Sequence, residues 1–348
     1  MLTLIYFILI LGIIVFFHEL GHFIWAKKSG VYCYEFSLGF GPKLFSFHRK
    51  HDETEYCLRL FPVGGYVAMA GEEVDDDKSV PKSKKMYNKP WYKKLIIVLA
   101  GVMHNFILAF VVLFLMALIY GSVSTKPTLG IVSEDSAAYK AGIKVGDTIT
   151  RVNGKKTNSW DDVIITLTIS NGDKYQTLNI IDKDGNEKII KVKPKKIVDK
   201  KGNVSYAYGM GLTDKKEYGF APSLKYAVDK FGSLFKTMFI TVKALITGKV
   251  SVNALSGPVG IYSIVGQQSK AGLSGLMYLL AYLSVNVGFI NLLPFPAFAG
   301  YRALIIIIET ITKKKVNPKV DAIVNNIGLI LLFGLMIFIT IKDILKLF

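Results

Sequence analysis

The sequence predicts a polytopic α-helical membrane protein with four transmembrane helices and an inserted β-rich domain. Three observations predict this class. The 348 residues are 51% hydrophobic and only 20% charged, which is too apolar for a soluble protein of this length. Four stretches are apolar enough to cross a bilayer, which takes roughly 20 residues. A segment of sharply different composition separates the second stretch from the third.

The apolar stretches cover residues 4–25, 95–120, 276–298 and 322–345. The first lies where a secretory signal peptide would lie, but no Lys or Arg precedes Lys27 and the stretch ends in charged residues. A signal peptide would begin with basic residues and end at a small-residue cleavage site. We therefore expect the first stretch to be a permanent helix.

Basic residues predict the orientation in the membrane. They crowd the loop between the first two stretches and the short loop between the last two, which contains Lys313, Lys314 and Lys315. By the positive-inside rule both loops are cytoplasmic, so both termini and residues 121–275 are expected outside. The net charge of +17 fits anionic lipid head groups. No nucleic acid is expected as a partner, because no known reader motif accompanies the charge.

The chain is expected to divide into residues 1–121, a first membrane part with two transmembrane helices, then 122–217 and 218–348. In the middle part, short strands alternate with glycine and Asn-Gly turns, and one short Ala-rich helix lies between them. This order resembles a PDZ domain of the kind found in envelope proteases. Another small β-rich domain is the alternative.

The last part opens with an aromatic and Lys-rich stretch at 222–248, which has helical spacing. It has no room to span a membrane, so we expect an amphipathic helix along the membrane surface. The remaining two transmembrane helices follow it.

The strongest chemical signal lies inside the first apolar stretch. His18 and His22 are four residues apart, which places both imidazoles on one helix face, where they can reach a single zinc ion. Glu19 points beside that face and can take a proton from an activated water and pass it to a departing amine. Burying an ionisable side chain inside a membrane costs free energy, so such a residue suggests a function by default. Packing or proton-relay histidines are the alternative.

At this point the chain resembles the site-2 protease family, in its bacterial RseP-like branch of intramembrane zinc metalloproteases (peptidase M50). The resemblance covers almost the whole chain, although Val102 replaces a proline that is usual in the family. The matching segments are residues 17–22, 39–45, 61–67 with 69–72, 100–106, 256–261 and 291–294.

The resemblance implies a protease of the bacterial inner (cytoplasmic) membrane that uses Zn²⁺ and cuts transmembrane segments, as in regulated intramembrane proteolysis. Its substrates would be single-span membrane proteins in the lipid bilayer, such as an anti-sigma factor or a signal-peptide remnant. The extracytoplasmic PDZ domain would act as a size filter, admitting substrates that another protease has already shortened. His18 and His22 would bind the metal, and Glu19 would be the general base and acid.

Substrate-binding residues are also implied. Asn291 resembles the family Asn that binds the unwound substrate backbone, and Gly64 and Gly65 lie in a region that resembles the family's membrane-re-entrant β-hairpin. A helix shields its own carbonyls, so the scissile bond must first unwind and find new hydrogen-bond partners. A helix-capping Asn and an ordinary cytoplasmic hairpin are the alternatives. His104, also at membrane depth, is expected to be a packing histidine.

One departure from the family pattern bears directly on activity. The resemblance places an Asp, the third zinc ligand, at the position of Ala299. A catalytic zinc normally has three protein ligands and a water, so His18 and His22 alone should hold it weakly. Glu309 and Asp321 are the nearest downstream carboxylates that could substitute. Phe298 and Tyr301 also look atypical, so natural degeneration and engineering both remain open.

Two hypotheses follow from these residues. The first is an intramembrane zinc metalloprotease. The second is a catalytically impaired member that keeps the fold and binds membrane proteins without cleavage. Ala299 favours the second, and the intact set of His18, Glu19 and His22 favours the first.

Overall fold

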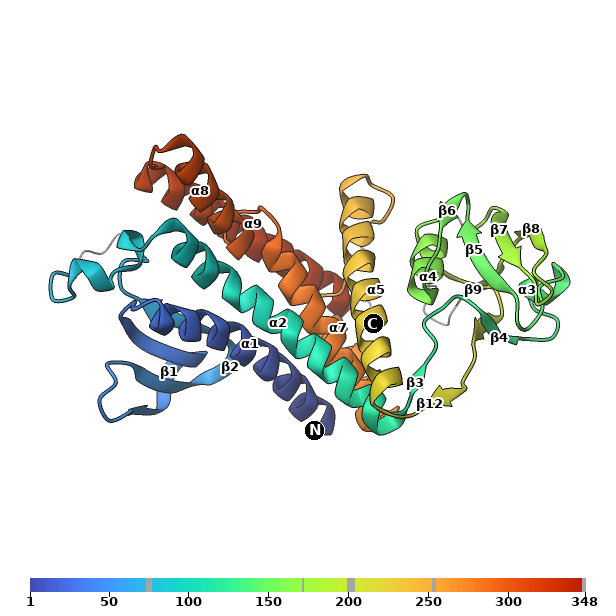
Figure 1. Cartoon of the computed structure of the whole chain (residues 1–348), viewed down its shortest axis with the longest axis horizontal. Helices are drawn as coiled ribbons and strands as arrows, with labels where there is room; N and C mark the ends of the chain where they lie inside the picture. The colour runs from blue at the N-terminus through green and yellow to red at the C-terminus, as the bar shows by residue number, and fades with distance from the viewer. Residues whose placement is uncertain (73–76, 171, 199–203, 252–254, 346–348) are drawn as a thin grey trace. The chain divides into compact units, whose positions relative to one another are not determined.

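The computed structural model describes residues 1–72, 77–170, 172–198, 204–251 and 255–345 (Figure 1). The chain forms two compact units. The first combines residues 1–112 with 256–344, and the second centres on 113–255.

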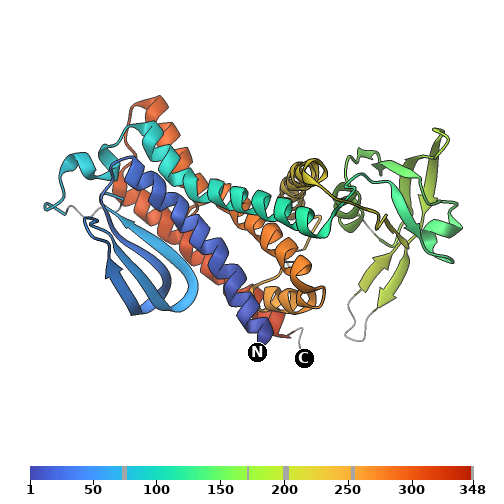
Figure 2. The same ribbon diagram turned by 60° about the horizontal axis from the view of Figure 1, so that its bottom comes forward.

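The first unit consists of helices and one small sheet formed by two long strands. Its elements in chain order, which can be followed in Figures 1 and 2, are α1 (Leu2–Lys28), β1 (Cys33–His48), β2 (Glu55–Met69), the short 3-10 helices η1 (Lys82–Lys84) and η2 (Met86–Asn88), α2 (Trp91–Tyr120), α6 (Pro258–Ser269), α7 (Gly272–Leu292), α8 (Ala299–Thr312) and α9 (Pro318–Leu345). Helix α2 continues beyond residue 112 into the second unit.

Four of the described helices are long and apolar enough to cross a membrane, as expected: α1, α2, α7 and α9. The expected end of the third was wrong. Helix α7 ends at Leu292, not near 298, because Leu293 is extended. Two prolines follow, Pro294 and Pro296, and a proline both lacks an N–H and forces its predecessor out of the helical region. Phe298 instead precedes α8 as its N-cap.

The strands β1 and β2 pair with each other along three stretches. Residues 35–38 pair with 65–68 on one side and with 55–58 on the other, and residues 43–48 pair with 55–59. The segment 65–69 is therefore an edge, and among the described residues no strand lies on its other side. Figure 2 shows this sheet beside α1, against which it packs.

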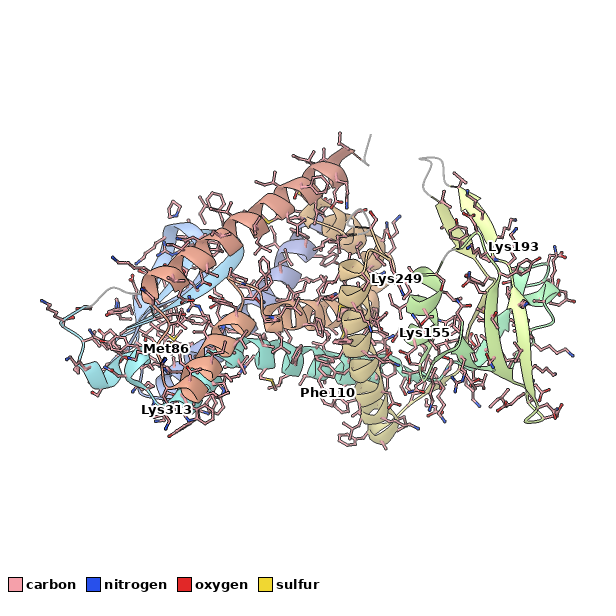
Figure 3. The ribbon with its side chains drawn as sticks, turned by 90° about the horizontal axis from the view of Figure 1, so that it is seen from above. Met86, Phe110, Lys155, Lys193, Lys249 and Lys313 are labelled. Carbon is pink, nitrogen blue, oxygen red and sulfur yellow. The ribbon has the colours of Figure 1, made fainter. Side chains whose placement is uncertain are left out.

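The core of the first unit joins the sheet to the helices. Phe36 and Val67 from the strands pack with Met86, with Ile97 of α2 and with Ile306 of α8. Figure 3 labels Met86 among these side chains and Lys313 where α8 ends. This core holds α8 against the sheet, against the C-terminal end of α1 and against the first turns of α2.

The second unit contains the expected β-rich segment. Its strands are β3 (Ser122–Val123), β4 (Leu129–Val132), β5 (Thr148–Val152), β6 (Lys155–Lys156), β7 (Gln176–Ile181), β8 (Glu187–Val192), β9 (Lys195–Val198), β10 (Val204–Ala207), β11 (Met210–Leu212) and β12 (Lys216–Glu217). The largest sheet has the strand order β6-β5-β7-β8. The smaller pairs are β4 with β11, β9 with β10 and β3 with β12.

The helices of the second unit are α3 (Ala137–Lys140), α4 (Trp160–Thr168) and α5 (Phe220–Ile246). The Ala-rich helix was expected, but α4 was not. The signal for α4 was present, because Ser159 and Asp162 form a capping box at its start. The expected Asn-Gly turn is confirmed: Asn153 and Gly154 both have positive φ between β5 and β6.

Helix α5 confirms the helical spacing expected for residues 222–248 and packs on α4 through charged groups. The Lys230 ammonium contacts both carboxylate oxygens of Asp161 at 2.8 Å, and Lys236 contacts Asp162 at 2.8 Å. At the start of α5, the Phe220 ring meets the ring of Phe114 in α2 at a centroid distance of 5.4 Å.

Candidate metal site

His18 and His22 meet as their spacing predicts. Their Nε2 atoms are 3.3 Å apart and their ring centroids are 4.9 Å apart. Both side chains are partly buried on the face of α1 that lines a cavity of about 780 Å³. Two imidazole nitrogens this close can contact one metal ion together, since zinc binds imidazole nitrogen at about 2.0 to 2.1 Å.

Helix α2 forms a close wall behind the two imidazoles. A Cβ atom at Gly101 would lie 2.3 Å from Nε2 of His22 and 2.9 Å from Cε1 of His18. On the facing helix, a Cβ at Gly21 would lie 2.5 Å from the carbonyl oxygen of Ala100. Neither position has room for a side chain. The two glycines therefore let the helices approach until the imidazoles touch the backbone of α2.

The ring of His22 is oriented by a backbone contact. Its Nδ1 lies 2.8 Å from the carbonyl oxygen of Ile97, which can only accept, so Nδ1 donates and Nε2 keeps its lone pair. This is the arrangement that metal-binding histidines usually show. His18 makes the corresponding contact with a side chain, since its Nδ1 lies 3.2 Å from Nδ2 of Asn105.

The cavity brings together most of the residues expected at the site. Its lining includes His18, Glu19, His22, Gly65, Asn291 and Ala299. Gly64 does not line it. That residue lies within β2 with a φ of +103°, and a Cβ there would lie 2.1 Å from the Phe40 ring, so this position of the strand requires glycine.

The hairpin edge lies directly against the expected general base. A Cβ atom at Gly65 would lie 3.1 Å from Cγ of Glu19 and 2.8 Å from the carbonyl oxygen of Ser37. The lack of a side chain at residue 65 therefore lets the edge strand approach Glu19. The other residues of this edge, 66–69, line the same cavity.

Asn291 lies in the cavity wall at the end of α7. Its Nδ2 donates to the carbonyl oxygen of Val287 at 3.0 Å, one turn earlier in the same helix. The side chain thus both satisfies a carbonyl near the helix end and borders the site. His104 does not border it. Its Nδ1 lies 2.9 Å from the carbonyl oxygen of Ala100, in the manner of a packing histidine.

The third ligand position is the point at which the site departs from a complete zinc centre. Ala299, the first residue of α8, lines the cavity and offers no ligand atom. Among the described residues, no third His, Cys, Asp or Glu brings a ligand atom within 4.8 Å of both histidines. The residues present therefore fit zinc at two imidazole positions and leave a third protein position unfilled.

The two suggested substitutes are engaged elsewhere. Glu309 accepts a hydrogen bond from the backbone N–H of Val316 at 2.9 Å. Asp321 accepts one from the hydroxyl of Tyr301 at 3.0 Å. Neither carboxylate lines the cavity.

Sequence reasoning missed two polar pairs in the cavity wall. Arg302 of α8 forms an ion pair with Glu72, which follows β2 in the chain. Asp77 accepts a hydrogen bond from the hydroxyl of Tyr34 at 2.7 Å. Glu72 lay within a recognised motif, but Arg302 is 230 residues away from it. Nothing in the local sequence of either residue signalled this pairing.

Comparisons with known proteins agree on one family. The sequence model of peptidase family M50 matches residues 6–335. The chain is 32% identical to the regulator of sigma-W protease RasP of Bacillus subtilis over 99% of both chains. It is also 32% identical to the zinc metalloprotease RasP of Bacillus licheniformis and 31% identical to that of Shouchella clausii, again over 99% of both chains.

Proposed function

The chain belongs to peptidase family M50, the site-2 proteases, and from this premise we propose that it is an intramembrane zinc metalloprotease that cleaves transmembrane segments of membrane proteins. The observation that carries the proposal is the 3.3 Å contact between Nε2 of His18 and Nε2 of His22, with Glu19 in the same cavity. The names of the relatives support zinc as the metal.

In this proposal, His18 and His22 hold the metal and Glu19 moves the protons. Zinc, when bound, supplies a water acidic enough to lose a proton near neutral pH. The Glu19 carboxylate can accept a proton from water and later donate it to the amine that leaves the cleaved peptide bond.

The substrate backbone is proposed to join the hairpin edge. Residues 65–69 hydrogen-bond to β1 on one side and border the cavity on the other. An unwound substrate segment could add to this edge as a further strand, which would satisfy the peptide groups that leave their helix. Asn291 lines the same cavity, which supports its proposed role, and its Nδ2 would bind the same segment after leaving the Val287 carbonyl.

The sheet itself is proposed to dip into the membrane. Its far end exposes large apolar side chains, which cost free energy in water but not among lipid chains. They include Phe40, Phe45, Phe47, Leu58 and Phe61, each at least 45% exposed. A cytoplasmic hairpin would leave these apolar side chains in contact with water.

The proposal also covers the β-rich domain, the kind of substrate and the location in the cell. The segment 122–217 would be a PDZ domain outside the bacterial inner membrane, and substrates would be single-span proteins that an earlier cleavage has shortened. The β-rich fold and the four membrane-length helices support this arrangement. The excess of Lys and Arg in the loop between the first two membrane-length helices and in the loop between the last two supports the orientation.

Ala299 favours a second candidate function, in which the chain binds membrane proteins without cleaving them. A site with two imidazoles and no third protein ligand among the described residues would hold zinc weakly. The second candidate keeps the edge strand and the cavity but not hydrolysis.

Cleavage of a tagged single-span substrate by the purified protein in liposomes tests the proposal. We expect cuts within the transmembrane segment that a zinc chelator stops and that Glu19→Gln abolishes. Glu309→Gln, which changes a carboxylate outside the cavity, should cleave normally. Capture of the substrate without any cut would support the second candidate instead, and cutting by Glu19→Gln would contradict the proposed role of this residue.

A further inference from the structure

Asn105 is a fully buried residue of α2 at which three helices meet. Its side-chain Nδ2 lies 3.2 Å from Nδ1 of His18 in α1. Its backbone carbonyl accepts a hydrogen bond from the hydroxyl of Ser284 in α7 at 2.8 Å. The other side-chain atom, Oδ1, is buried and has no hydrogen-bond partner among the described residues. A buried acceptor without a donor costs free energy and calls for an explanation.

The hydrogen bonds around the two histidines run in one direction. The carbonyl of Ile97 accepts from Nδ1 of His22, so Nε2 of His22 is a bare acceptor. The proton between the two Nε2 atoms must then belong to His18. With its proton on Nε2, His18 accepts at Nδ1 from the Asn105 amide. In this arrangement His18 therefore carries its proton on Nε2.

This arrangement is incompatible with metal binding at His18. An imidazole offers a lone pair to a metal only where it carries no proton, so the proton of His18 must move from Nε2 to Nδ1. Nδ1 then becomes a donor and needs an acceptor at the place where the Asn105 NH₂ group now lies. Rotation of the amide by half a turn brings Oδ1 to that place.

We propose that Asn105 is a positioning residue that reverses its amide when His18 changes tautomer, so that it stabilises both the empty and the metal-loaded site. The inference rests on the proposed zinc function of His18. An amide suits this task because it can both donate and accept, whereas a carboxylate only accepts and an aliphatic side chain does neither. The unpartnered Oδ1 is the acceptor that the loaded state requires.

The zinc affinity of three variants tests the proposal. It is measured by chelator competition on the full-length protein in detergent. Asn105→Leu should bind zinc more weakly by a factor of about 10 to 100, as losses of groups that orient metal ligands do. Asn105→Asp keeps an acceptor and should bind zinc at least as tightly as the unchanged protein. Ser284→Ala is the matched control, because it disturbs the same helix contact but leaves the amide intact. It should bind normally.

A second group could accept the hydrogen bond from Nδ1 of His18, and this possibility defines the result that would contradict the proposal. The backbone carbonyl of Gly101 also interacts with His18. If that carbonyl alone accepted the hydrogen bond from Nδ1–H of His18, Asn105→Leu would bind zinc as tightly as the unchanged protein. The proposal would then be wrong. Each affinity should be measured with and without Ala299→Asp, so that weak binding at the incomplete site does not mask the difference.

The tautomer itself gives a second readout that needs no zinc. In ¹⁵N spectra of the metal-free protein with labelled histidines, His18 should carry its proton on Nε2, and Asn105→Asp should move it to Nδ1. The His18 signal is assigned by its loss in His18→Ala. A proton on Nδ1 in the unchanged protein would overturn the inference. Zinc binding that is unaffected by His18→Ala would instead contradict the proposed function, so the two failures are distinguishable.

Discussion

Gly101 of α2 lies so close to His22 of α1 that a Cβ atom at residue 101 would stand 2.3 Å from Nε2. Side-chain atoms do not approach this closely without displacement. The backbone of α2 is therefore part of the wall that fixes the two imidazoles, and the separation of α1 and α2 sets the geometry of the site.

Replacement of this glycine should disturb the site and the helix packing together. We expect Gly101→Ala to lower zinc affinity at least tenfold and to destabilise the protein by about 1 to 3 kcal/mol, as overpacking typically does. Gly12→Ala is the matched control, because nothing lies within 4 Å of the added Cβ at that position of α1. Chelator competition and thermal unfolding in detergent measure both effects. Equal zinc affinity in the two variants would contradict the close wall.

The β-rich segment should fold without the membrane. Its core contains fully buried Leu178, Ile149 and Val163, and about 90 residues can bury a small core. We expect residues 126–217 expressed alone to unfold cooperatively, with Leu178→Ala lowering the free energy of unfolding by about 2 to 5 kcal/mol. Circular dichroism during urea titration measures this. A segment that shows no transition would indicate that it depends on α5 or on the membrane.

The proposed orientation predicts which residues chemical labels reach. Single cysteines near Lys85 and Lys314 should react only after the membrane is permeabilised, whereas one at Asn186 should react in intact cells. The two native cysteines, Cys33 and Cys57, are buried and should be replaced first to remove background. Protection of residue 186 in intact cells would overturn both the orientation and the extracytoplasmic role of the β-rich domain.

Features that depend on local spacing were predicted well from the sequence. The four-residue spacing of His18 and His22 fixes their relation on any α-helix, and apolar runs locate the membrane-length helices. The end of α7 was misplaced because hydropathy continues past Leu292, whereas Pro294 stops the helix through its missing N–H. The hydropathy of a segment therefore does not show where its helix ends.

Contacts between distant segments could not be predicted in this way. Asn105 meets His18 across 87 residues, and Arg302 meets Glu72 across 230. Only the packing of α1, α2, α8 and the sheet brings these partners together. The motif containing Asn105 was recognised, but its spacing does not say which atom of the amide meets which nitrogen of the imidazole.

We expect Ala299 to be the residue that limits metal binding, and the zinc content of the protein tests this most directly. The unchanged protein and Ala299→Asp, purified in detergent and dialysed against the same zinc buffer, should differ in bound zinc. A carboxylate at 299 that completes the site should raise affinity and cleavage by at least the factor of about 10 to 100 that losses outside the ligand set cost. His18→Ala in the restored chain should remove the gain. If the unchanged protein already binds one zinc as tightly as Ala299→Asp and cleaves as fast, another group completes the site and the account of Ala299 is wrong.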